Sequence, residues 1–499
     1  MNKTAIIDIG SNSIRMVIIA IDNKSFRIVD ELKETVRLGM DMTEDGSLNS
    51  ERMDKAFKTL SFFKALCHAQ NIHEIKIVAT EAVRKASNQK EFLNLIKSSL
   101  NLDIKILSGK EEAYYDYFGV VNSLDIPSAL LMDIGGSSTE LIWMDNRKIK
   151  ESISLPMGAI NITERFSLEN ALDEGKEKAL NKFLNEKFDE VPWLKEVKNL
   201  PLIGIGGSIR NIAKIHSKKE NYPLDTLHNY VLKIEDVRDI HSSVKTKDLN
   251  QRKKIRGLSK DRADVFLGPL SSVMCIINKC SINKVIVSGS GIREGLIYEH
   301  ILNGTTPVED VFQFSLENHM GIYEIDVTHA QQVWKLSHML YLELIPLLNT
   351  STSSHNILKT ASLLHDCGIR INYYNHQELS YHIIIRSKLN GLSHKELLMA
   401  AYVSALHRKN EFKVDEKHYE TILNSDDMAI IEKLGLLLRI SENLDRAMNS
   451  NVKKLYCNIS EDEVKINVLS DSDASLEINS AMDCSNAFKR IFNKKLTIV

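Results

Sequence analysis

Three short turns in the first 210 residues have the composition of phosphate-binding loops, and each follows an apolar run. Glycine and serine allow backbone N–H groups and hydroxyls to approach an anion without side-chain bulk. One such turn is weak evidence, because most Gly-Ser turns after strands are ordinary turns. Three together predict a phosphate site, with candidate ligands Ser11, Asn12, Ser13, Gly135, Gly136, Ser137, Ser138, Gly206, Gly207 and Ser208.

Carboxylates accompany two of these turns. Asp8 precedes the first turn, and Asp133 and Glu140 flank the second. A pair of carboxylates beside phosphate oxygens is what Mg²⁺ requires, either directly or through water. We therefore predict that Asp133 and Glu140 bind a metal ion, with Asp8 as a third candidate.

A further acidic pair begins a predicted helix at Ser108-Gly-Lys-Glu-Glu112. Ser108 and Glu111 have the spacing of a capping box, which gives Glu111 a structural task. Glu112 projects about 100° away around the helix. It is either a solvated helix-start residue favoured by the macrodipole or the general base that deprotonates an attacking water. We predict the second role, because the phosphate turns and the other acids accompany it.

The segment Ala79-Thr-Glu-Ala-Val-Arg84 follows a strand-like run over 75–79. It precedes a helix that we expect to start at Asn88, with Glu91 completing an N-cap box. Thr80 and Arg84 would then lie on a loop at the carboxyl end of a strand, where open α/β sheets bind ligands. Arginine binds phosphate in a bidentate manner, so both residues are candidate phosphate ligands.

An internal repeat organises these motifs. Residues 7–18 and 132–143 are related at an offset of 125, and each reads as a β-hairpin with a tight polar turn. Amphipathic helical stretches follow, around 51–70 and 173–188. Two more strand–turn–helix units lie at 202–210, with a helix expected near Arg210, and at 285–294. The repeat predicts two related α/β halves with a cleft between them.

Composition and pattern define the remaining domains. The formal net charge of −2 argues against a globally basic nucleic-acid binder, and the six scattered cysteines suggest reduced thiols. No apolar run approaches the roughly 18 residues of a membrane span, so we expect a cytoplasmic protein. The α/β alternation stops near Gly304-Thr-Thr-Pro307. We predict four domains: 1–123, 124–304, a helical domain 305–450 and a small α+β domain 451–499.

Seven motifs, in order along residues 1–300, resemble the exopolyphosphatase / guanosine-pentaphosphate phosphatase family. The resemblance implies a duplicated actin-like (ribonuclease H-like) α/β ATPase fold. It implies that Glu112 is the catalytic glutamate, that Asp133 and Glu140 position metal and water, and that Arg84 lines a phosphate channel. The sequence departs mildly from the family pattern at two positions: Ser137 stands where glycine is common, and Ser208 stands where threonine is common. The motifs are Asp8-Ile-Gly-Ser-Asn-Ser-Ile-Arg15, Ala79-Thr-Glu-Ala-Val-Arg84, Ser108-Gly-Lys-Glu-Glu-Ala113, Asp133-Ile-Gly-Gly-Ser-Ser-Thr-Glu140, Gly204-Ile-Gly-Gly-Ser208, Asp261-Arg-Ala-Asp264 and Ser288-Gly-Ser-Gly-Ile-Arg-Glu-Gly295.

Longer members of the family carry a C-terminal domain that resembles HD phosphohydrolases. The resemblance implies a second metal site formed by His329, His365, Asp366 and Asp445, which His407 could join. Two residues depart from the pattern: Cys367 follows the His-Asp pair, and Leu379 stands where relatives often have a histidine.

The predicted function is Mg²⁺-dependent (or Mn²⁺-dependent) release of terminal phosphate from inorganic polyphosphate, from guanosine pentaphosphate (pppGpp), or from both. Relatives imply a homodimer, with no nucleic-acid or membrane partner. The cleft motifs supply Arg15, Arg84 and Arg262, and Arg293 is a further candidate. Basic clusters at 252–256, 453–454 and 489–495 are solvated faces or extend a track for a long substrate.

Two other hypotheses share some of these features. Actin-fold sugar and acetate kinases have the same Asp-x-Gly hairpins, but the segments at 79–84 and 108–113 fit the phosphatases better. A non-catalytic sensor of polyphosphate or nucleotide would need no water-activating carboxylate. The presence of Glu112, Asp133 and Glu140 therefore favours an enzyme.

Overall fold

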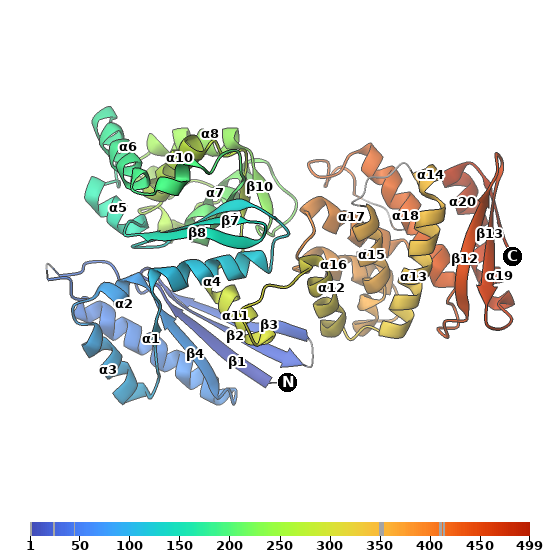
Figure 1. The fold of residues 1–499 in the computed structure, drawn as a ribbon, viewed down its shortest axis with the longest axis horizontal. Coiled ribbons are helices and arrows are strands. Elements are labelled where there is room, and N and C mark those ends of the chain that lie inside the picture. The colour runs from blue at the N-terminus through green and yellow to red at the C-terminus, as the bar shows by residue number, and fades with distance from the viewer. Residues whose placement is uncertain (1, 23–24, 44, 349–353, 409–411, 413–414) are drawn as a thin grey trace. The chain divides into compact units, whose positions relative to one another are not determined.

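The computed structural model describes residues 2–22, 25–43, 45–348, 354–408, 412 and 415–499 (Figure 1). The chain divides into two compact units, residues 1–311 (unit 1) and residues 312–499 (unit 2). Each unit is built around its own sheet or helix core. Unit 1 contains the duplicated α/β motifs, and unit 2 contains the helical stretch and the C-terminal strands.

The first sheet of unit 1 has the strand order β3-β2-β1-β4-β5. The β1, β2 and β3 strands form an antiparallel meander, whereas β4 runs parallel to β1 and β5 runs parallel to β4. Both faces of β1 and β2 are buried, and most of their buried residues are isoleucine, valine and alanine. The strands are β1 (Asn2–Ile9), β2 (Ile14–Asp22), β3 (Ser25–Glu34), β4 (Glu74–Ala79) and β5 (Lys105–Ile106).

The second sheet repeats this order as β8-β7-β6-β9-β11, with β10 added antiparallel at the β11 edge. As in the first sheet, the first three strands are antiparallel, and the two central strands β6 and β9 are parallel. The predicted duplication is therefore confirmed at the level of strand order. The strands are β6 (Ala129–Ile134), β7 (Thr139–Asp145), β8 (Lys148–Leu155), β9 (Leu202–Ile205), β10 (Tyr230–Leu232) and β11 (Val285–Val287).

Helices complete both halves of unit 1. In the first half, α1 and α3 cover one face of the sheet through residues such as Phe63 and Phe92. In the second half, α6, α7, α8 and α10 build a larger core around Phe188 and Phe266. The helices are α1 (Ser50–Ala69), α2 (Glu81–Lys85), α3 (Gln89–Leu100), α4 (Gly109–Val121), α5 (Ala159–Phe166), α6 (Glu174–Asp189), α7 (Gly206–Lys219), α8 (Ile234–Lys245), α9 (Leu249–Arg252), α10 (Leu267–Cys280) and α11 (Ile292–Leu302), with 3₁₀ turns at Pro192–Lys195 and Lys260–Arg262.

Two helices connect the halves (Figure 1). The α4 helix packs against α11 and lies over β7 and β8 of the second sheet, and α11 returns from the end of unit 1 to pack on β1 and β2. Glycines make this approach close: a Cβ on Gly119 would lie 2.5 Å from the carbonyl oxygen of Gly291, and a Cβ on Gly295 would overlap the Tyr115 carbonyl. The helix that carries Glu112 is thereby held against both sheets.

Several local expectations need correction. Strands β3 and β8 were not predicted, because they are edge strands rich in charged residues. Thr80 is the N-cap of the short helix α2, so Thr80 and Arg84 do not lie on an extended loop. Asn88 makes no capping hydrogen bond, because its side chain accepts from the Leu48 amide at 2.9 Å instead. The capping box of Ser108 and Glu111 is confirmed.

In the described residues of unit 2, the regular elements up to residue 443 are all helices, and a three-stranded sheet of order β12-β13-β14 follows. Its described elements are α12 (Val311–Ile322), α13 (Val327–Glu343), α14 (Ile345–Leu348), α15 (Ser354–Leu364), the 3₁₀ turn Cys367–Arg370, α16 (His376–Arg386), α17 (His394–Ala405), α18 (Ser425–Asn443), β12 (Val452–Ile459), β13 (Glu463–Ser470), α19 (Ser475–Met482), α20 (Ser485–Phe492) and β14 (Lys495–Ile498). Within unit 2, the C-terminal sheet is joined to α13 by hydrogen bonds from Gln332 to the Val452 carbonyl and from the Cys457 amide to Glu343.

Among the residues that the structure describes, none of the helices combines the length and apolar character required for a membrane span.

The close contact of α4 with α11 yields a stability prediction. Gly295→Ala should destabilise unit 1 by about 2 kcal/mol, because the new methyl group overlaps the Tyr115 carbonyl and forces the two helices apart. The measurement is urea unfolding followed by circular dichroism. Gly304→Ala is the matched control, since its Cβ would have its nearest neighbour at 3.9 Å. Equal stability of the two variants would show that the helices are not tightly packed.

Candidate functional site

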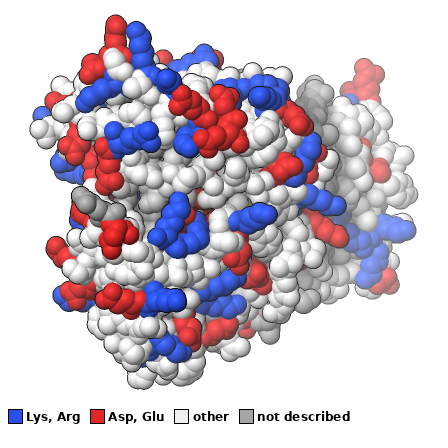
Figure 2. Space-filling model, turned by 60° about the vertical axis from the view of Figure 1, so that its left-hand side comes forward, with Lys and Arg blue, Asp and Glu red and all other residues white. Residues whose placement is uncertain are grey.

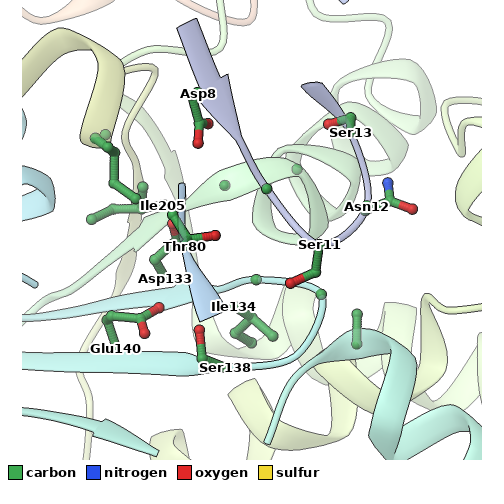
Figure 3. Close-up of a pocket in the computed structure, with 18 of the residues that line it drawn as sticks. Asp8, Ser11, Asn12, Ser13, Thr80, Asp133, Ile134, Ser138, Glu140 and Ile205 are labelled. Atoms are coloured by element: carbon green, nitrogen blue, oxygen red, sulfur yellow. The ribbon is translucent and has the colours of Figure 1, made fainter. Parts of the chain in front are cut away.

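The two hairpin turns of the repeat have the same backbone geometry. The Gly10 amide donates to the Ser13 carbonyl at 3.1 Å, and the Gly135 amide donates to the Ser138 carbonyl at 3.0 Å. Strand register then pairs Asp8 with Arg15 and Asp133 with Glu140. Both turns open into one pocket of unit 1, so the repeat places equivalent residues on its two sides (Figure 3).

The third predicted turn is the start of α7. The helix begins at Gly206, four residues earlier than expected, so its N-terminal amides face the pocket and form a favourable site for an anion. Gly206 has φ +82°, and a Cβ there would overlap the carboxylate of Asp133. Glycine is required at this position for both its conformation and the close approach of Asp133.

Three carboxylates from different elements come together beside the pocket, and two of them, Asp133 and Glu140, line it. Asp116 on α4, Asp133 at the end of β6 and Glu140 on β7 offer oxygen atoms that all lie within 4.8 Å of one another. Both carboxylate oxygens of Asp116 are buried without a hydrogen-bond partner in the described part of the chain, whereas Glu140 accepts from Ser154 at 2.7 Å. Figure 3 shows Asp133 and Glu140 on the same side of the pocket.

Burial and mutual repulsion make these carboxylates difficult to ionise together. Burial raises the pKa of Asp133 to about 6. Burial, followed by the charges of the neighbouring acids, raises the pKa of Asp116 and of Glu140 well above their ordinary values. Burial also raises the pKa of Asp8, against the opposing effects of Arg293 and Arg15. Ionising all of these closely spaced acids at neutral pH is unfavourable unless a cation lies beside them.

A divalent metal ion fits this set. All of the donors are carboxylate oxygens, which suit Mg²⁺ or Mn²⁺, and the two unpartnered oxygens of Asp116 supply free ligand positions. Asp133 and Glu140 were predicted from sequence, but Asp116 was missed. Its position four residues after Glu112, on the same face of α4, was the available signal. Asp8 lines the pocket outside the three-carboxylate group.

Glu112 is 3% exposed and lies on the same helix as Asp116. Its carboxylate contacts the guanidinium of Arg84, which also contacts Glu81 and donates to the Leu107 carbonyl at 2.5 Å. Burial raises the pKa of Glu112 to about 7, although the hydrogen bond from Arg84 opposes the shift. A carboxylate with this pKa is suited to accept a proton near neutral pH.

Arginines supply the positive charge of the pocket. Arg15, Arg210, Arg262 and Arg293 line it, and Arg293 pairs with Glu31 at 2.6 Å. Burial, then the neighbouring guanidinium of Arg293, lowers the pKa of Arg15 to about 10, so the side chain stays charged. On the face drawn in Figure 2, basic and acidic side chains are intermixed. Arg210 was expected only as a helix start, and it faces the pocket because α7 begins one turn earlier.

Three predicted phosphate ligands do not line this pocket. Arg84 is engaged with Glu81 and Glu112. Ser208 is buried within α7, and Ser137 lines a separate surface hollow with Asn161 and Glu164. The structure brings the other candidates together: Asp8, Ser11, Asn12, Ser13, Arg15, Thr80, Glu112, Asp133, Gly135, Gly136, Ser138, Glu140, Gly206, Gly207 and Arg262. Arg252, which was considered for a basic track, is fully buried and donates to the carbonyls of Leu168 and Asn170.

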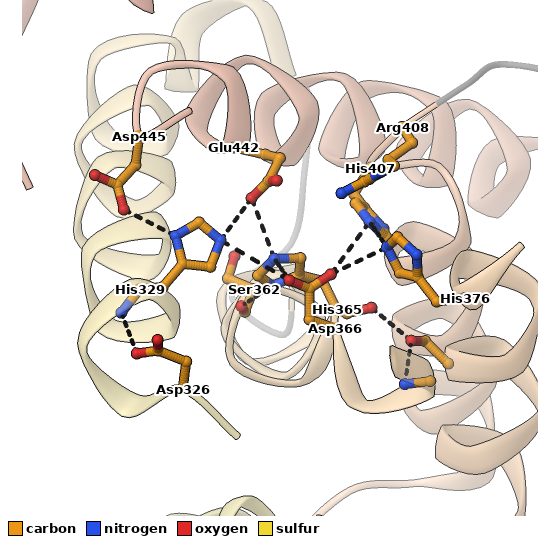
Figure 4. Close-up of polar contacts among 12 residues, drawn as sticks. Asp326, His329, Ser362, His365, Asp366, His376, His407, Arg408, Glu442 and Asp445 are labelled. Carbon is orange, nitrogen blue, oxygen red and sulfur yellow. Dashed lines mark hydrogen bonds and ion pairs between the residues drawn. The ribbon is translucent and has the colours of Figure 1, made fainter. Parts of the chain in front are cut away.

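The residues predicted for a second metal site lie together in unit 2. His329, His365 and Asp366 offer ligand atoms to a common point (Figure 4). Asp445 lies behind His329, with its Oδ2 2.8 Å from the His329 Nδ1. His407 is close to Asp366, with 3.6 Å between the His407 Nε2 and the Asp366 Oδ1.

Comparison with known proteins supports a single family over most of the chain. Residues 17–304 match the Ppx/GppA phosphatase family, and residues 311–482 match its domain III. A guanosine-5'-triphosphate,3'-diphosphate pyrophosphatase of Aliivibrio fischeri (strain MJ11) is 26% identical over 469 residues, which cover 92% of this chain and 91% of the relative. The protein of the same name from Vibrio campbellii is 25% identical, with 96% coverage of both chains.

Solved structures agree over about 60% of the chain. The crystal structure of the Aquifex aeolicus Ppx/GppA family member is 30% identical, with a TM-score of 0.53, and the match covers 60% of this chain and 98% of that one. An exopolyphosphatase from Cytophaga hutchinsonii has a TM-score of 0.57 at 24% identity, covering 61% and 99%, and supports the fold.

The chain belongs to the Ppx/GppA phosphatase family, and its actin-like fold is that of the family's solved structures. Family membership indicates a phosphoanhydride hydrolase, a class that generally uses divalent metal ions. The kinase hypothesis is thereby set aside.

The buried acids of this site predict that the effect of Mg²⁺ on the stability of the folded protein depends on pH. An acid whose folded-state pKa is raised keeps its proton in the folded protein at a pH where the unfolded chain has lost it. The contribution of these acids to the free energy of unfolding is therefore fully present below about pH 4. It is lost as pH rises through about 6 to 7, the folded-state pKa values of Asp133 and Glu112. Mg²⁺ competes with protons, so it should raise the melting temperature more at pH 8 than at pH 5.

The measurement is the melting temperature with and without Mg²⁺ across this range. At a Mg²⁺ concentration about 100-fold above its dissociation constant, the expected gain is about 2.7 kcal/mol. Asp116→Asn should leave the metal-free protein as stable as before, or more stable, and should reduce the gain. A Mg²⁺ effect that is equal at both pH values and unchanged in Asp116→Asn would contradict the assignment.

Proposed function

We propose that the chain is a Mg²⁺-dependent hydrolase that removes the terminal phosphate from inorganic polyphosphate, and that pppGpp is a second substrate. One observation carries the proposal. The buried Glu112, whose pKa is raised to about 7, lines the same pocket as Asp133, Glu140 and the glycine-rich turns suited to phosphate. A binding protein would have no use for a base of this kind. The geometry therefore favours the enzyme over the non-catalytic sensor.

In this proposal, Glu112 accepts the proton of the water that attacks the terminal phosphorus. Arg84 holds the Glu112 side chain in place through its ion pair, and Glu81 fixes Arg84 from the other side. Burial excludes competing solvent and keeps the pKa of the base near the operating pH.

The phosphate chain would be bound by backbone amides and charged side chains around the pocket. The turns at Gly10 and Gly135 and the N-terminus of α7 present N–H groups, and Arg15, Arg210 and Arg262 supply positive charge. Asp116, Asp133 and Glu140 would hold Mg²⁺, which neutralises charge on the phosphate oxygens. The remaining residues act by orienting the substrate, which provides much of the catalysis of phosphoryl transfer.

The two substrates share a terminal phosphoanhydride and differ in the group to which it is attached. The relatives named guanosine-5'-triphosphate,3'-diphosphate pyrophosphatase align along almost the whole chain and support pppGpp. The pocket contains charged and backbone groups suited to phosphate, which supports polyphosphate. We further assign residues 1–123 and 124–304 to the two actin-like halves, 305–450 to an HD-like domain and 451–499 to a small C-terminal domain.

Glu112→Gln should reduce turnover by about 10²- to 10⁴-fold with little change in substrate affinity, because it removes proton transfer and leaves the phosphate contacts in place. The measurement is phosphate release together with binding of a non-hydrolysed substrate. Glu111→Gln is the matched control, since Glu111 caps α4 through Ser108 and is about 39% exposed at its side chain. A larger loss in Glu111→Gln, with the fold intact, would contradict the assignment.

The substrate preference is tested by comparing release of phosphate from long-chain polyphosphate and from pppGpp at equal Mg²⁺. Activity on either substrate that requires Glu112 supports the hydrolase. Tight binding of both substrates without phosphate release, in wild type as in Glu112→Gln, would instead indicate the sensor.

A further inference from the structure

Arg262 lines the pocket of unit 1 without a partner for its charge. Its guanidinium lies against the N-terminus of α7, where a Cβ on Gly207 would overlap it. Among the described residues, the Arg262 side chain forms no ion pair and no hydrogen bond. The N-terminus of a helix is itself positive, so the guanidinium and the helix together favour an anion at this side of the pocket.

Two aspartates close to Arg262 in sequence could neutralise it. Asp261 precedes Arg262 in a 3₁₀ turn, and Asp264 follows two residues after it. Burial, and then the charge of Arg15, lowers the pKa of Arg262, while Asp261 and Asp264 act in the opposite direction. Both carboxylates are therefore near enough to attract the guanidinium. An unpaired carboxylate at this position would form an ion pair with Arg262 and compete with an anion in the pocket.

Both carboxylates are instead paired with cations of the first half of unit 1. The Oδ2 of Asp264 lies 3.0 Å from the Nη1 of Arg37. The Oδ2 of Asp261 lies 3.2 Å from the Nζ of Lys33. The Nη2 of Arg37 also donates to the Asp261 carbonyl at 3.1 Å. Each acid next to Arg262 therefore has a partner other than Arg262.

Of these two pairs, the one made by Arg37 is the more protected from solvent. The side chains of Arg37 and Asp264 are 24% and 21% exposed. Those of Lys33 and Asp261 are 35% and 42% exposed, so water weakens this second pair more. The backbone of Arg37 is held too, because its amide donates to the Asn12 carbonyl at 2.9 Å, in the first phosphate turn. Arg37 therefore connects that turn to the segment that carries the pocket arginine of the second half.

We propose that Arg37 keeps Arg262 available for phosphate by pairing with Asp264, and that Lys33 has the same, weaker effect at Asp261. Arg37 is then a positioning residue. It does not contact the substrate, and it acts by engaging an acid that would otherwise draw Arg262 away from the anion. Because the ligand of Arg262 is taken to be a phosphate anion, this role of Arg37 rests on the proposed function, but it requires only that the anion binds.

An ion pair that serves only to hold the two halves together would behave differently. In that case, removal of either partner would weaken phosphate binding to the same extent, because the same contact is lost. If Arg37 acts by engaging Asp264, loss of Arg37 is harmful and loss of the Asp264 charge is not. Removal of both should restore binding, because no unpaired carboxylate then competes for Arg262.

The test measures the affinity of the full-length protein for tripolyphosphate with Mg²⁺ by calorimetry, in a Glu112→Gln background so that the anion is not consumed. Arg37→Asn is the first variant, because Arg37 has φ +57° and asparagine tolerates this left-handed conformation. Asp264→Asn is the second, because its amide oxygen can still accept from the Val265 amide as the Asp264 carboxylate does.

We expect Arg37→Asn to weaken binding by about 10- to 100-fold, the effect of losing a charged hydrogen bond to phosphate. Asp264→Asn and the double variant should bind as tightly as the Glu112→Gln parent. Arg52→Ala is the matched control, because Arg52 also pairs with an aspartate, Asp41, at 2.9 Å and is 28% exposed. It should bind as the parent does. Circular dichroism shows whether each variant is folded.

The outcomes separate the role of Arg37 from the proposed function. Normal binding by Arg37→Asn, equal weakening in Asp264→Asn, or a double variant as weak as Arg37→Asn would each overturn the role of Arg37, whether or not the wild type releases phosphate. The expected pattern of affinities in a protein whose wild type releases no phosphate would support the role of Arg37 and refute the hydrolase. Failure of both the parent and the wild type to bind tripolyphosphate would contradict both.

Discussion

The site of unit 1 depends on the repulsion among buried carboxylates. Asp116, Asp133 and Glu140 offer oxygen atoms within 4.8 Å of one another, with Asp116 and Glu140 buried and Asp133 partly buried. Ionising all three without a cation is unfavourable, because desolvation and like charges both favour the neutral forms. The packing of the two sheets and of the helices between them holds the three carboxylates together despite this unfavourable free energy. The carboxylates are therefore already positioned to bind a metal ion.

The duplication explains how such an arrangement can be built. Each half supplies one Asp-x-Gly hairpin, and register places Asp8 and Arg15 on one side and Asp133 and Glu140 on the other. The two halves have diverged in charge: the first presents an arginine where the second presents a glutamate. A symmetrical framework thus produces an asymmetrical pocket, with anion-binding groups and metal-binding groups facing each other.

Much of this could be predicted from the sequence, because the hairpin turns and the capping box are local patterns. The duplicated sheets and the pocket residues Asp133, Glu140 and Glu112 followed from them. Asp116 and Arg210 were missed because their roles depend on where a helix begins and on which element faces it. Charged edge strands β3 and β8 lack the alternation that marks a half-buried strand. Asn88 was misread because its partner, Leu48, is distant in sequence, and for the same reason the contact of Arg84 with Glu112 was not predicted.

The return of α11 to the first sheet has a consequence for how the protein is made. Ile6, Val17, Ile19 and Val78 of the first half are covered by Leu296 and Ile297, which are synthesised more than 200 residues later. While a ribosome is still making the second half, the emerging first half exposes an apolar sheet face that its own residues, such as Leu107 and Tyr115, cover only in part. Contacts of such long sequence separation form slowly, and exposed strands attract other chains. The nascent protein is therefore a natural client for chaperones until residue 302 has left the ribosome.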